Sequence, residues 1–153
     1  MEQGIIINRN TKAIRDSLKN AGIQPSASRM AIASFVWNTD SHPTAEEVKI
    51  EVEKAFPTVS LATVYNTLNL FVEKGLLKEV QDSNQRSVRY DCNTTPHFHF
   101  IDEATGQMMD LDPEVLRISP DLSKLGAEFK IREIEVTLRG RKMGTPQDKV
   151  KQK

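Results

Sequence analysis

The chain has 153 residues, enough for one ordinary domain or two small ones. A hydrophobic content of 38% and a mean hydropathy of -0.47 are typical of a soluble globular protein, and no apolar run approaches the roughly 18 residues that span a bilayer. Lys+Arg and Asp+Glu both number 21, so no overall positive charge indicates nucleic-acid binding, and one cysteine excludes an internal disulfide. We therefore expect a cytoplasmic protein with no membrane partner.

Helical spacing of apolar residues predicts two helices at the start of the chain. The first covers residues 11–21, with Gly22 as a left-handed cap. The second begins near Ser26 and runs through Trp37.

Two further helices follow, each with a start signal. Thr44-Ala-Glu-Glu47 has the pattern of a capping box, in which the threonine hydroxyl and Glu47 satisfy reciprocal backbone donors. That helix is expected to end at Pro57 and to bury Val48, Val52, Ala55 and Phe56. Ser60 is the expected N-cap of the fourth helix and Gly75 ends it. Its expected apolar face is Leu61, Val64, Leu68 and Phe71 or Val72.

After Gly75 the pattern changes to that of strands. Residues 77–80 and 87–90 are two short strand-like segments separated by turn residues. These helices, followed by a two-stranded wing, predict a winged helix-turn-helix domain over residues 1–90, with the helix from Ser60 to Lys74 in the DNA major groove.

A second, mixed α/β domain is predicted beyond a hinge at residues 91–96. Strands at 97–101 and 107–111 form a hairpin. Residues 113–129 are expected to be helical, with an interruption at Ser119-Pro120, and residues 130–139 to be a last strand. The domain is expected to cover residues 97–145, with a loose tail at 146–153. The fold class is therefore α+β.

All three histidines of the chain are candidate metal ligands. His97 and His99 are two apart on a strand, so they point to one face, and Asp110 on the returning strand reaches that face. Asp91 lies at the domain boundary, and His42 precedes the capped helix. Imidazole and carboxylate suit Fe2+, Mn2+ and Zn2+. Spacing alone leaves a polar surface as the more common interpretation of two histidines on a strand.

The ordered motifs resemble the ferric uptake regulator (Fur) family. They are His42-Pro-Thr, Phe56-Pro-Thr-Val-Ser-Leu-Ala-Thr-Val-Tyr-Asn66-Thr-Leu, Gly75-Leu-Leu-Lys-Glu-Val, Arg89-Tyr-Asp91 and His97-Phe-His99, and the match runs from about Leu18 to Gly140. The pattern is most similar to the peroxide-responsive repressors (PerR) of that family. The resemblance implies a homodimer that binds a palindromic operator in double-stranded DNA.

The resemblance also implies a regulatory site for Fe2+ or Mn2+, which Zn2+ can also occupy in vitro. Its ligands would be His42, Asp91, His97, His99 and Asp110. Aspartate at 110 favours peroxide sensing, because iron-responsive members usually carry glutamate there. Five protein ligands leave a sixth position open to peroxide, and the resemblance implies oxidation of His42 or His97.

The chain departs from the family in its cysteines. Many relatives hold a structural zinc with two Cys-x-x-Cys pairs, but here those positions fall at Asp102 and Thr105, and near Lys142 and Thr145. We therefore expect no structural zinc, and a dimer held by strand pairing and apolar packing. The residues that resemble the family's DNA-contacting positions are Arg29, Ser60, Ala62, Thr63, Tyr65 and Asn66.

The first hypothesis is thus a metal-dependent repressor that senses peroxide, and not an enzyme. An iron- or manganese-responsive regulator is the alternative within the family. A small mononuclear iron enzyme is the alternative outside it, since His97-x-His99-x-x-x-Glu103 resembles a first cupin motif. The chain has no fourth histidine to complete such a site, and an enzyme would leave the winged helix unexplained.

Overall fold

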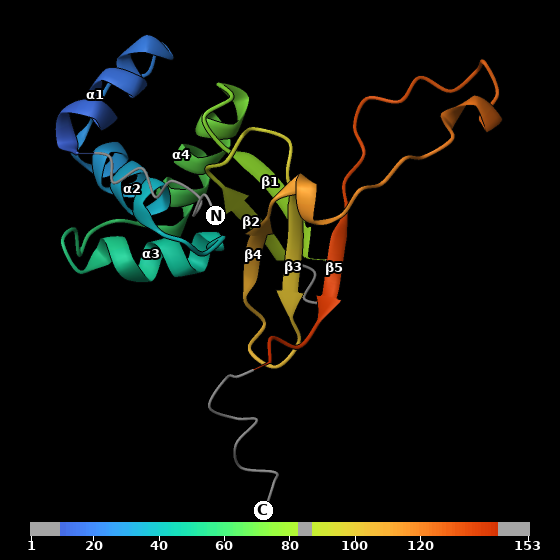
Figure 1. Ribbon diagram of the computed structural model, residues 1–153. Coiled ribbons are helices and arrows are strands. Elements are labelled where there is room, and N and C mark those ends of the chain that lie inside the picture. The colour runs from blue at the N-terminus through green and yellow to red at the C-terminus, as the bar shows by residue number, and fades with distance from the viewer. Residues whose placement is uncertain (1–9, 83–86, 144–153) are drawn as a thin grey trace, which may run out of the picture. The chain divides into compact units, whose positions relative to one another are not determined.

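The computed structural model describes residues 10–82 and 87–143, which divide into two compact units between Thr94 and Thr95. The element order is four helices, two strands, then three strands, as Figure 1 shows. Within the described ranges, no helix combines the length and apolarity needed to cross a membrane.

The first unit begins with α1 (Thr11–Asn20) and α2 (Ala27–Asn38), as the spacing predicted. Asn10 and Ser26 cap these helices by accepting hydrogen bonds from the amides of Ala13 and Arg29. Gly22 has a φ of 74°, which confirms it as the left-handed residue after α1.

The capping box before α3 (Ala45–Glu53) is confirmed, with both reciprocal hydrogen bonds present. The expected continuation to Pro57 is wrong. The amides of Ala55 and Phe56 both bond to the Val52 carbonyl, so the chain turns after Glu53 and Phe56 folds back against the core. Ala55 is consequently exposed.

Ser60 caps α4 (Leu61–Glu73), and Gly75 follows it with a φ of 71°. Val64, Leu68 and Phe71 are buried as predicted, whereas Leu61 is 36% exposed because it lies in the first turn, beyond the edge of the core. Trp37 stacks on Phe71 with ring centroids 5.8 Å apart, so α2 and α4 share one core.

The wing consists of β1 (Lys78–Asp82) and β2 (Ser87–Asp91), which pair antiparallel with Lys78 opposite Asp91. The expected turn between them lies largely outside the described residues, at 83–86. Tyr90 reaches from β2 into the helical core and is 2% exposed. Burial raises the pKa of its hydroxyl to about 12.

The second unit contains a three-stranded sheet in the order β4-β3-β5. β3 (Phe98–Asp102) pairs antiparallel with β4 (Met108–Leu111) and parallel with β5 (Thr137–Gly140). The predicted hairpin is confirmed, with Gly106 at a φ of 72° in its turn.

The helix expected at 113–129 is wrong. Figure 1 shows this segment as a long loop with short turns, and the turns are 3₁₀ turns at Pro113–Val115 and Leu122–Lys124. Pro120 lacks an amide donor and disfavours helix in Ser119, which explains the break between the two turns. The last strand covers only residues 137–139 of the predicted 130–139 and continues to Gly140, pairing with β3 from His99 to Asp102. The expected loose tail at 146–153 lies outside the described residues.

Candidate metal centre and nucleic-acid interface

Three candidate metal ligands converge in the second unit. His99 on β3 lies directly opposite Asp110 on β4. His97 immediately precedes β3, two residues before His99. The Nε2 atoms of His97 and His99 are 2.9 Å apart. The Asp110 Oδ1 atom is 3.2 Å from the first and 3.8 Å from the second. Each side chain thus offers one ligand atom to a common point, and this trio could hold a metal ion.

A backbone carbonyl orients one of the imidazoles. The Nδ1 atom of His97 lies 2.7 Å from the Thr95 carbonyl oxygen. Because a carbonyl can only accept, Nδ1 carries the proton and donates it, which leaves the Nε2 lone pair directed at Asp110 and His99. Such a contact from outside the ligand set fixes the tautomer that binds a metal.

The two other candidate ligands form a pair in the first unit. His42 Nε2 is 3.4 Å from Asp91 Oδ2, and both side chains are buried. The other carboxylate oxygen of Asp91 accepts the amide of Asn93 at 2.7 Å, so Oδ2 is the oxygen that faces the imidazole. Tyr90 donates its amide to the Pro43 carbonyl at 3.0 Å, which ties the His42 loop to β2.

The expected DNA-contacting residues lie on α4 and at the start of α2. Ser60 and Thr63 share a hydroxyl contact of 2.9 Å at the α4 N-terminus, and Asn66 lies one turn further along. Tyr65 is 37% exposed, and Ala62 is also exposed. Arg29 donates to the Gln24 carbonyl at 3.0 Å, which braces the guanidinium beside the α2 N-terminus.

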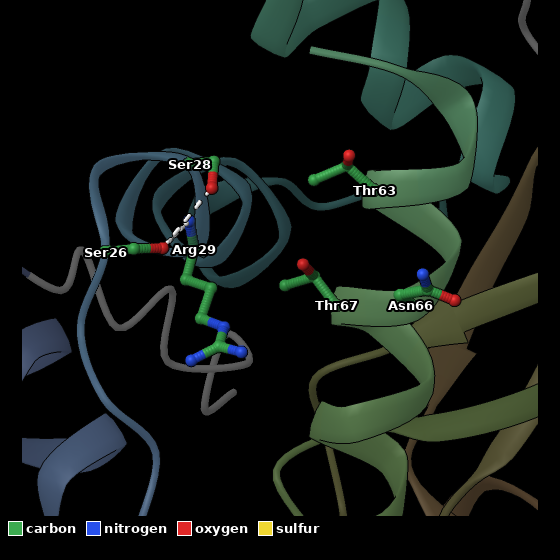
Figure 2. A pocket seen from close by; sticks show the side chains of 6 residues that line it. All are labelled: Ser26, Ser28, Arg29, Thr63, Asn66 and Thr67. Atoms are coloured by element: carbon green, nitrogen blue, oxygen red, sulfur yellow. Dashed lines mark hydrogen bonds between the residues drawn. The ribbon is translucent and has the colours of Figure 1, made fainter.

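A polar pocket lies between α2 and α4, and some of the residues that line it were not predicted from the sequence. Figure 2 shows Thr63 and Thr67 extending from α4 towards Ser28 and Arg29. The missed residues are Ser26, Ser28 and Thr67. Helical spacing could have identified Thr67, because it lies four residues after Thr63.

Sequence reasoning also missed the partner of Tyr65. Its hydroxyl donates to Glu46 Oε1, on α3, at 2.9 Å. This hydrogen bond raises the pKa of Tyr65, while the pKa of Glu46 is lowered, first by its backbone hydrogen bond and then by Tyr65. Glu46 is therefore a carboxylate at neutral pH.

Comparisons with known proteins decide the family. The model of the ferric uptake regulator family matches residues 20–139. The chain belongs to the Fur family. It is 32% identical over 124 residues to the peroxide-responsive repressor PerR of Staphylococcus epidermidis, covering 81% of this chain and 82% of that protein. PerR of Staphylococcus aureus matches at the same identity, over 81% of this chain and 83% of its own length.

Solved Fur-family structures share the fold. A zinc-bound manganese uptake regulator matches with a TM-score of 0.64 at 23% identity, over 85% of this chain and 98% of its own. PerR of Streptococcus pyogenes matches with a TM-score of 0.50 at 28% identity, over 87% and 90%. The α+β fold expected from the sequence is thereby confirmed, and the chain is a regulator of the Fur family.

Proposed function

We propose that this Fur-family chain is a homodimeric, metal-dependent transcriptional repressor of the cytoplasm that senses peroxide. In this proposal residues 1–90 bind a palindromic operator in double-stranded DNA, and 91–96 act as a hinge. Residues 97–145 carry dimerisation and metal sensing. The similarity to the PerR proteins supports the peroxide assignment.

The convergence of His97, His99 and Asp110 is the observation that carries the proposal. We propose that His42 and Asp91 complete a five-ligand site for Fe2+ or Mn2+. Two properties support this. Imidazole and carboxylate ligands suit these ions. His42 and His97 each face a carboxylate oxygen, of Asp91 and Asp110 respectively. Bound Fe2+ would supply the redox chemistry that activates peroxide, while the two electrons of the net reaction come from the histidine ring.

The proposed signal is the oxidation of a ligand. A ring carbon of His42 or His97 gains one oxygen from peroxide, and the second oxygen leaves as water. The modified ring is a poorer ligand, so the site loosens and the operator is released. Loss of one ligand acts on DNA affinity because metal binding and DNA binding are thermodynamically linked.

On the DNA side, α4 is the proposed major-groove helix. Asn66 can hydrogen-bond adenine, and the exposed ring of Tyr65 can contact a thymine methyl. Arg29, with the hydroxyls of the α2–α4 pocket, is suited to a backbone phosphate.

Peroxide treatment of the metal-loaded protein tests the sensing step. The reduced protein is loaded anaerobically with Fe2+ or with Mn2+, bound to an operator duplex and exposed to peroxide. We expect loss of DNA binding and one added oxygen on the peptides bearing His42 or His97, with iron only. Persistent binding and unmodified histidines in the iron form would contradict peroxide sensing and favour an iron- or manganese-responsive regulator.

A further inference from the structure

Arg89 ties the His42 loop to the wing. It lies on β2, two residues before Asp91, and is 7% exposed. Its Nη1 donates to the His42 carbonyl at 2.8 Å. A buried guanidinium with a fixed fork of donors holds its acceptors in one geometry. The backbone position of His42 is therefore set from β2.

The same guanidinium reaches the first turn of α3. Its Nη1 is 3.5 Å from Glu47 Oε2, and its Nε is 3.7 Å from Asp82 Oδ2 on β1. Glu47 Oε2 also accepts the amide of Thr44 at 2.8 Å in the capping box. One cation thus contacts both the His42 loop and the cap of α3, so a shift of the loop acts on that cap.

The neighbouring residue of this turn contacts α4. Glu46 Oε1 accepts the Tyr65 hydroxyl at 2.9 Å, while the side chain of Glu47 faces Arg89. The Tyr65 ring is partly exposed, while its hydroxyl donates its hydrogen bond to α3. The direction of the Tyr65 ring therefore depends on where the α3 N-terminus lies.

We propose that the first turn of α3 links His42 to Tyr65, with Arg89 and Glu46 as positioning residues. This inference rests on the proposed function, because it requires His42 to bind metal and Tyr65 to contact DNA. A metal that restrains His42 would restrain Arg89, Glu47 and the turn, and so the orientation of Tyr65. By reciprocity, bound DNA would raise metal affinity through the same contacts.

The test is the gain in DNA affinity that Mn2+ gives. The full chain is used with a duplex that the Mn2+-loaded protein selects from a random pool, and affinity is measured with Mn2+ and with a chelator. The gain is the ratio of the DNA affinity with Mn2+ to the DNA affinity with the chelator. We expect this ratio to fall by about two- to thirty-fold in Glu46→Ala, Tyr65→Phe and Arg89→Lys. Glu51→Ala is the matched control, because Glu51 is on the same helix and pairs with Lys54. Its gain should equal that of the wild type.

The double variant Glu46→Ala/Tyr65→Phe should lose no more of the gain than either single variant, since both remove one contact. If Glu46→Ala and Tyr65→Phe alter affinity by the same factor with and without Mn2+, the turn does not transmit the metal state. A wild-type protein with no Mn2+-dependent gain would instead contradict the proposed function. Trp37 fluorescence checks that Arg89→Lys is folded. The exposed Glu46 and Tyr65 carry the test if it is not.

Discussion

At the residue scale, the chemistry of the second unit depends on which ring nitrogen of His97 carries the proton. The Thr95 carbonyl accepts from Nδ1, so Nε2 is available as a ligand. Asp110 then supplies the negative charge nearest to that nitrogen, with its Oδ1 3.2 Å away. Because this oxygen lies near both imidazoles, loss of its charge should weaken metal binding more than loss of the charge of Asp112, two residues later.

Asp110→Asn tests this expectation. We predict that its affinity for Mn2+ falls by about 10- to 100-fold or more. Mutation of residues that only hydrogen-bond to metal ligands already has an effect of this size. Isothermal titration with Mn2+ measures it. Asp112→Asn removes the same charge two residues later, where the carboxylate caps a 3₁₀ turn by accepting the Glu114 amide, and should titrate like the wild type. Equal affinities for the two variants would argue against Asp110 as a ligand.

At the scale of elements, α3 is short and depends on its capping box. Thr44 Oγ1 accepts the Glu47 amide, and Glu47 returns a contact to the Thr44 amide. α3 packs against both α2 and α4, so its start positions the helix proposed to enter the major groove.

Thr44→Ala should therefore lower the free energy of unfolding of the first unit by about 1 kcal/mol. Chemical denaturation followed by Trp37 fluorescence measures this, because the only tryptophan of the chain is buried in that core. Thr58→Ala, at an exposed loop threonine, should leave the unfolding midpoint unchanged. A Thr44→Ala protein as stable as the wild type would show that the cap is energetically unimportant.

At the scale of the whole molecule, the second unit exposes many large apolar side chains in the long loop between β4 and β5. They are Val115, Ile118, Leu122, Leu125, Phe129, Ile131 and Ile134. An exposed apolar surface of this kind is typical of a protein–protein interface. It supports the proposal that the dimer is held by apolar packing in place of a tetrathiolate zinc.

Metal removal should consequently separate DNA affinity from assembly. We predict that a strong chelator weakens binding to the operator yet leaves the dimer intact, because residues 102, 105, 142 and 145 offer no thiolates to a structural zinc. Light scattering after size-exclusion chromatography measures the mass. Dissociation into monomers on chelation would refute this account of the dimer.

Local patterns were sufficient for the starts of the four α-helices and for the hairpin. Thr44-Ala-Glu-Glu47, Ser60 and Gly75 act on their own turns of backbone, so helix starts and ends could be predicted where such residues occur. The end of α3 could not, because it depends on Phe56 folding back to the core. The helix expected at 113–129 is replaced by two 3₁₀ turns, one on each side of the interruption that Ser119-Pro120 indicated.

The sequence by itself determined the Fur-family fold and the candidate ligands, because motif order and strand alternation are local properties of the chain. Only the tertiary structure decided which atoms meet. It brought Asp110 opposite His99 through strand register, set the His97 tautomer through a backbone carbonyl, and placed Glu46 on Tyr65 and Arg89 on the His42 carbonyl. The Tyr65–Glu46 and Arg89–His42 contacts join residues 19 and 47 positions apart, and their distances depend on packing that no local pattern encodes.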